Sequence, residues 1–139
     1  MTSAGWSAVT EPALAAPIEA IERGYEYLLA YAAQGRQDDA GTELRATLTH
    51  MHHALTAIQG LIGAGFAEVP AAMGVGDFAD AVERDVRSAR GAIGLVLSRE
   101  RIASLLVDNL NASVHLRALL TDLFLIDQAG KAAAQTREA

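Results

Sequence analysis

The chain has 139 residues and a formal net charge of −6 at pH 7, with 17 acidic residues against 11 basic ones. A surface this acidic argues against nucleic-acid binding, which needs basic groups to neutralise phosphates. The absence of cysteine excludes disulfides, thiolate nucleophiles and zinc–thiolate sites built by this chain.

Apolar residues make up 51% of the chain but aromatic residues only 5%. The core must therefore consist mainly of Ala, Leu, Ile and Val, a mixture that favours helices. We expect an all-α fold: an antiparallel four-helix bundle with a long apolar, glycine-rich loop between its second and third helices. The length suits a single domain, placed at 12–128, with flexible tails at 1–11 and 129–139.

The first expected helix carries apolar residues at alternating steps of four and three, which places them along one side: Leu14, Ile18, Ile21, Tyr25, Leu28 and Ala32. Thr10 suits an N-cap, whereas Pro17 predicts that the regular helix begins or bends there. Gly35 marks its end. Trp6 lies in the expected tail, where it either docks onto the bundle or anchors a partner.

The second expected helix has the same spacing in Leu44, Leu48, Met51, Leu55, Ile58 and Ile62. Asp38, Asp39 or Thr42 could cap it. This stripe turns His50 and His53 outward and leaves His52 at its edge. Two exposed imidazoles one turn apart are either solvated side chains, ligands of a transition metal, or phosphoacceptors. A metal site would need further ligands, and no recognisable ligand spacing supplies them.

The stretch "HHALTAIQGLI" resembles the phosphoacceptor helix of some histidine kinases, with Leu55, Ile58, Gly60, Leu61 and Ile62 in matching places. The resemblance implies a phosphotransfer or dimerisation module. It covers about fourteen residues and departs from the pattern at two positions. Thr49 stands where the phosphoacceptor belongs, and His53 stands where the family has Asn. The reactive group would then be His50 or His53.

The segment "GAGFAEVPAAMGVG", residues 63–76, holds four glycines, one proline and a single charge. Such a composition is unusual for a solvated connector. We expect an apolar loop that folds over the end of the bundle or meets a partner. The residues predicted to contact that partner are Phe66, Val69, Met73 and Val75, together with Trp6.

The third expected helix begins with Asp77 as its cap and buries Ala79, Val82, Val86, Ala89, Ile93 and Val96. Helical spacing then continues from Ser98 to Gln128. One helix from Asp77 to Gln128 would measure about 78 Å at 1.5 Å per residue, too long for a compact domain. A break is needed at Ser98, which we favour, or within Asp108–Asn111. Gly130 is the expected stop.

These observations predict a non-catalytic, cytoplasmic protein without a cofactor that binds another protein as an adaptor, regulator or small chaperone. Leftover apolar surface could also pair two copies. The alternatives are the histidine phosphotransfer module and a metal-binding bundle. No Gly-x-Ser-x-Gly turn or Gly-Lys-Ser/Thr loop indicates an enzyme. The N-terminus lacks the pattern of a signal peptide, and no window is apolar enough to predict a membrane span.

Overall fold

The computed structural model describes the backbone of residues 2–64, 66 and 69–138, and the side chains of 14–62, 66 and 69–130. Every regular element in that part of the chain is helical, which confirms the all-α class. The elements are α1 (Thr2–Ala32), α2 (Leu44–Ile58), α3 (Leu61–Ala64), the 3₁₀ turn η1 (Ala71–Met73), α4 (Val75–Leu97), α5 (Ser104–Ser113) and α6 (Leu116–Glu138).

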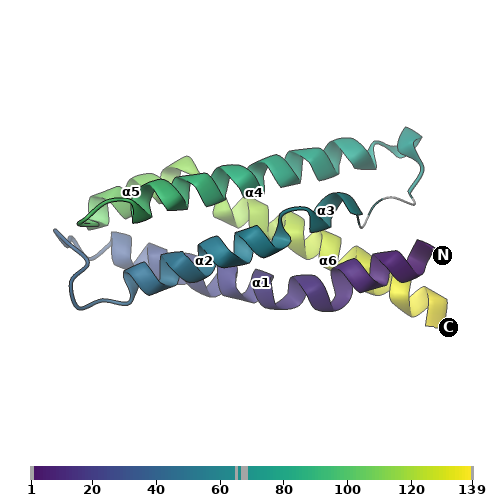
Figure 1. Cartoon of the computed structure of the whole chain (residues 1–139), viewed down its shortest axis with the longest axis horizontal. Helices are drawn as coiled ribbons and strands as arrows, with labels where there is room; N and C mark the ends of the chain where they lie inside the picture. Colours follow the sequence, from purple (N-terminus) through teal and green to yellow (C-terminus); the bar gives the residue numbers. More distant parts are fainter. Residues whose placement is uncertain (1, 65, 67–68, 139) are drawn as a thin grey trace.

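The chain reverses direction after α1, again between α3 and α4, and once more after α4 (Figure 1). Helix α1 packs against α2, α5 and α6, and α2 packs against α4. The two chain ends lie at one end of the molecule. The connections 33–43 and 98–103 meet at the other end (Figure 1). Among the described residues, no helix combines the length and apolar character needed to cross a bilayer.

The core follows the predicted helical spacing closely. All six stripe residues of α4 are buried, as are the six assigned to the second helix, from Leu44 to Ile62. In α1 the stripe shifts slightly, because Tyr31 is buried whereas Tyr25 is half-buried. The apolar periodicity therefore identifies the buried side of each helix.

Helix α1 begins earlier than predicted, at Thr2, so that Pro17 lies within it and Thr10 does not cap it. Leu14 and Ile18 are buried on either side of Pro17. Their packing stabilises the helix through a position where proline removes a hydrogen bond. The side chain of Trp6 lies outside the described residues. Helix α6 likewise continues past Gly130 to Glu138, across the segment expected as a tail.

The favoured break at Ser98 is confirmed, since α4 ends at Leu97 and α5 begins at Ser104. A second break follows, because Val114 has an extended backbone and α6 starts at Leu116. The alternative break within Asp108–Asn111 does not occur, because these residues lie inside α5, and the break at Val114 was not predicted. The prediction that Asp77 caps α4 is wrong. Gly74 turns the chain in a left-handed conformation, the helix begins at Val75, and Asp77 lies in its first turn.

Candidate functional site

The three histidines of α2 lie as the spacing predicts: His50 and His53 are exposed and His52 is half-buried. His50 lines a shallow groove between α1 and α2, together with Arg23 and Tyr27. Arg23 is paired with Glu19 at 2.6 Å. Whether His50 or His53 accepts phosphate stays a prediction.

The described part of the chain contains no group of three or more His, Cys, Asp or Glu side chains placed to hold a metal ion. His50 and His53 therefore have no third ligand beside them among those residues. A stable transition-metal site generally needs three or four protein ligands.

The apolar segment, defined here as Val69–Phe78, comprises the end of the connection between α3 and α4 and the first turn of α4. Phe66 packs on Phe78 with ring centroids 6.5 Å apart, and both rings are partly buried against the core. Val69 and Val75 are half-buried. Met73 differs from them because 71% of its surface is exposed. Of the predicted partner-binding residues whose side chains are described, Met73 is the most exposed.

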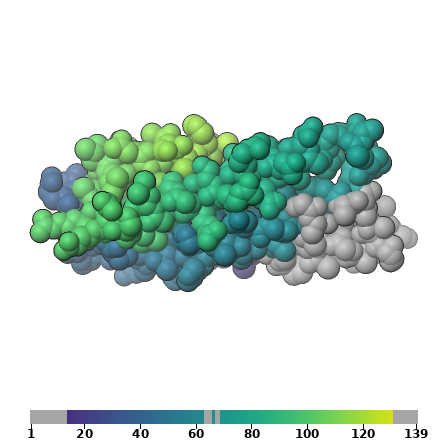
Figure 2. Space-filling model, turned by 45° about the horizontal axis from the view of Figure 1, so that its top comes forward, coloured from purple at the N-terminus to yellow at the C-terminus, as the bar shows by residue number. Residues whose placement is uncertain are grey.

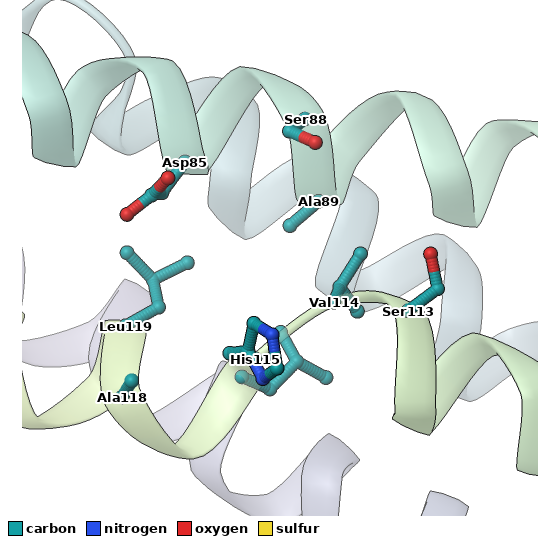
Figure 3. Close-up of a pocket in the computed structure, with 9 residues that line it drawn as sticks. Asp85, Ser88, Ala89, Ser113, Val114, His115, Ala118 and Leu119 are labelled. Carbon is teal, nitrogen blue, oxygen red and sulfur yellow. The ribbon is translucent and has the colours of Figure 1, made fainter.

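A hollow of about 230 Å³ lies between α4 and the break that separates α5 from α6 (Figure 3). Asp85 and Ser88 of α4 face His115 and Ser113 across it. These are the residue types of a catalytic triad, but no hydrogen bond joins the four described side chains. Without a nucleophile paired to a base, this hollow lacks the geometry of nucleophilic catalysis.

Asp85 also acts on the Asp122 carboxyl of α6. Burial raises the pKa of Asp122 above its ordinary value, and the negative charge of Asp85 raises it further. The folded state therefore binds a proton at Asp122 more readily than the unfolded state does. Its charged form opposes folding, and this cost grows as the pH rises through the folded-state pKa.

Replacing Asp122 with Asn should therefore raise the melting temperature at pH 7 by about 1–2 °C, since a partly exposed charge is worth only tenths of a kcal/mol. The gain should disappear below about pH 3.9, where the carboxyl is protonated in both states. Thermal melts at several pH values measure this. Asp108→Asn, at an exposed position of α5, is the control and should show no gain. An equal gain at all pH values would contradict the explanation.

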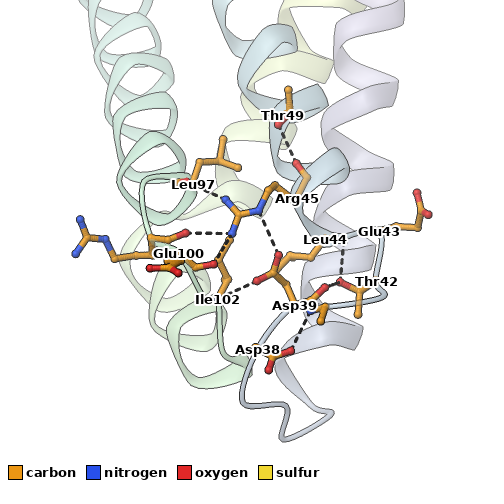
Figure 4. A network of polar contacts seen from close by, with 12 residues as sticks. Asp38, Asp39, Thr42, Glu43, Leu44, Arg45, Thr49, Leu97, Glu100 and Ile102 are labelled. Atoms are coloured by element: carbon orange, nitrogen blue, oxygen red, sulfur yellow. Dashed lines mark hydrogen bonds and ion pairs between the residues drawn. The ribbon is translucent and has the colours of Figure 1, made fainter.

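The most extensive polar network lies at the end of the molecule where residues 33–43 meet residues 98–103 (Figure 4). The Arg45 guanidinium donates to the carbonyl oxygens of Leu97 at 3.0 Å, Arg99 at 3.0 Å and Glu100 at 3.3 Å. It also pairs with the Asp39 carboxylate at 3.2 Å. Arg45 thus places a cation at the C-terminus of α4, where carbonyls lack helical partners.

Asp39 links the network to the other connection, since its Oδ1 accepts a hydrogen bond from the Ile102 N–H at 3.0 Å. Burial alone would raise the pKa of Asp39, but the hydrogen bonds from Ile102 and Arg45 outweigh it and lower that pKa. The carboxylate is consequently ionised at neutral pH and stays an acceptor for both donors.

Buried Tyr31 joins the same two segments from the core side. Its hydroxyl donates to the Ile102 carbonyl at 2.6 Å, and the Ser104 hydroxyl donates to the Tyr31 carbonyl at 2.7 Å. Ser104 also exchanges hydrogen bonds with the Arg36 backbone, at 2.9 and 3.0 Å. Burial raises the pKa of the Tyr31 phenol, which keeps the donor protonated. This network is an internal brace between residues 33–43 and residues 98–104.

Comparisons of the chain with models of known families, with curated proteins and with solved structures found no match. The function is therefore inferred from the surface of the protein. The sequence does not predict the Arg45 network, because most of its acceptors are backbone carbonyls more than fifty residues away. The only side-chain pair of the network that the sequence contains nearby is Asp39 and Arg45, six residues apart. Nothing in the sequence distinguishes that pair from other charged residues.

Proposed function

We propose that this protein is an antiparallel four-helix bundle of the cytoplasm that binds another protein through the apolar segment Val69–Phe78, without catalysing a reaction. The observation that carries the proposal is the 71% exposure of Met73. Methionine is unbranched and polarisable, so it adapts to partners of different shape, and it is common on binding surfaces.

The backbone around Met73 supports the proposal because it holds this side chain on a defined turn. The Met73 N–H donates to the Pro70 carbonyl at 3.1 Å, and the Gly74 N–H donates to the Ala71 carbonyl at 3.2 Å. Phe78 is anchored beneath by Phe66. A turn that is fixed before binding loses less conformational entropy on association than a flexible one does.

A photo-crosslinking amino acid at position 73, introduced in the native source, tests the proposal. The matched control is the same group at Leu105 of α5, which is 69% exposed and so equally accessible. We expect a covalent adduct with a protein from position 73 and none from position 105. Met73→Glu should reduce binding of the captured protein at least tenfold, because the charge would have to be desolvated at the contact.

Equal capture at the two positions would contradict the proposal, since it would reflect exposure alone. No capture at position 73 would also contradict it. Acid-labile phosphate on His50 or His53, supplied by a kinase and passed to a response regulator, would instead support the phosphotransfer alternative.

A further inference from the structure

The outward side of α4 has an ordered sequence of charges. Six exposed residues recur along it at steps of three and four: Asp77, Asp80, Arg84, Arg87, Gly91 and Leu95. They lie opposite the buried stripe that runs from Ala79 to Val96. Helix α4 lies along the surface of the molecule (Figure 2). This stripe, named here the α4 face, is therefore available to a partner.

The charges of the α4 face are segregated by sign. Both acidic residues, Asp77 and Asp80, precede both basic ones, Arg84 and Arg87. Within the described side chains, the structure forms ion pairs at Arg23–Glu19 and Arg45–Asp39, and none on this face. Two negative and two positive groups are thus exposed without a partner, in an order that favours a ligand with the reverse order of charge.

We propose that the α4 face binds the α4 face of a second copy of this chain, antiparallel and centred near position 82. In two antiparallel copies of one helix, facing residues have numbers with a constant sum. A sum of 164 places Asp80 opposite Arg84 of the second copy and Asp77 opposite Arg87 of the second copy. The twofold axis repeats both contacts, giving four ion pairs. Both contacts form at once because Asp77 and Asp80 are three residues apart, as are Arg84 and Arg87.

Other alignments of the same face are disfavoured by repulsion. A parallel dimer in register would place each charge against its own copy. Moving the antiparallel pair by one turn to a sum of 168 would set Arg84 against Arg84 of the second copy, and moving it to a sum of 160 would set Asp80 against Asp80 of the second copy. Juxtaposed like charges select against wrong arrangements. The charge order therefore specifies one orientation and one register.

The ends of the face supply the apolar part of the contact. Met73 lies in the turn just before α4, at the end of the helix that approaches Gly91 of the second copy. Gly91 has open space where a side chain would stand, and Leu95, 67% exposed, lies one turn beyond it. The dimer thus covers Met73. The inference rests on the proposed function in this respect, because it names a second copy as a partner of the same apolar segment.

Charge reversal tests the pairing. The basic variant carries Asp77→Arg with Asp80→Arg, so that all four charges of its face are positive. The acidic variant carries Arg84→Asp with Arg87→Asp, so that all four are negative. We expect the wild-type chain to form dimers in sedimentation runs reaching about 1 mM. Each variant alone should dimerise at least tenfold more weakly, and an equimolar mixture should form heterodimers. Circular dichroism checks that both variants are folded.

Spin labels on single-cysteine variants test the orientation, because the chain has no cysteine of its own. In the proposed dimer, labels at Ser88 would be about 18 Å apart along the axis and labels at Ser98 about 48 Å apart, at 1.5 Å per residue. A parallel dimer would give similar distances at both positions. Raising the salt from about 0.1 M to 1 M should weaken the dimer, because the Debye length falls from about 10 Å to 3 Å.

The outcomes separate this inference from the proposed function. A wild-type chain that stays monomeric, while position 73 captures a different protein, overturns the dimer and leaves the proposed function standing. The α4 pairing is also overturned if dimers persist in both charge-reversal variants, or if the label distances at Ser88 and Ser98 are equal. Failure of position 73 to capture any protein, including a second copy, overturns both.

Discussion

Replacing Gly24 with Ala should lower the free energy of unfolding by about 1–3 kcal/mol, the usual cost of overpacking a core. Gly24 of α1 is buried where this helix crosses α2. A Cβ atom at this position would lie less than 3.0 Å from Cγ and Sδ of Met51. Met51 is fully buried and has little room to move aside. The added methyl group would therefore push the two helices apart.

Chemical denaturation of Gly24→Ala and of a matched variant, Gly94→Ala, measures this effect. Gly94 lies within α4, and a Cβ there would meet only ordinary contacts with His52 at 3.8 Å or beyond. Ala should stabilise this second site by about 0.5–1 kcal/mol, because it loses less backbone entropy than Gly in a helix. Destabilisation of both variants by the same amount would show that the clash with Met51 is not the cause.

A double-mutant cycle isolates the contact. Met51→Ala alone removes a buried side chain and should itself cost about 2–5 kcal/mol. In that background the Gly24→Ala substitution should cost much less than it does in the wild-type chain, because the atoms it would meet are gone. Strict additivity of the two free-energy changes would show that contact with Met51 does not cause the destabilisation.

Replacing Arg45 with Met should lower the free energy of unfolding by about 1–3 kcal/mol, the cost of leaving polar groups unsatisfied. Met preserves the length and packing of the side chain but removes its donors. The Leu97 carbonyl, near the last turn of α4, would lose its charged partner. The ion pair with Asp39 contributes little to this figure, because the Arg45 side chain is 41% exposed and water screens the pair.

Arg101→Met is the control for this prediction. Arg101 is exposed in the same connection, and its side chain forms no hydrogen bond or ion pair with the described residues. Its loss should change the unfolding free energy by less than about 0.5 kcal/mol. Urea unfolding of the two variants side by side measures the difference. Matching losses would indicate a general effect of charge rather than closure of the α4 terminus.

The sequence predicts the buried sides of the helices because burial imposes a period that can be read from one chain. Leu44, Met51 and Ile93 illustrate this, since each lies on its predicted stripe and is fully buried. Helix ends are harder to predict because they depend on local competition. Pro17 indicates a helix start by its own chemistry, but the packing of Leu14 and Ile18 on both sides outweighs that preference.

The surface features likewise differ in whether the sequence predicts them. Exposure of His50 and His53 follows from spacing, and so does the charge order of α4. The accessibility of Met73 does not, because its neighbours Val69, Val75 and Phe66 have similar apolar character and are partly buried. Only the three-dimensional course of the turn distinguishes Met73 from them. The sequence does not predict the Arg45 network because most of its acceptors are backbone carbonyls more than fifty residues away.

The brace that joins residues 33–43 to residues 98–103 gives the two ends of the molecule unequal resistance to opening. At that end, separating the segments would break directional bonds of Tyr31, Arg45 and Ser104 together. At the other end, Phe66 and Phe78 meet through non-directional ring contact. Two apolar rings can shift relative to each other without leaving a hydrogen-bonding group unsatisfied. We therefore expect any change of shape on binding to occur near Phe66 and Phe78 rather than at the end held by Tyr31, Arg45 and Ser104.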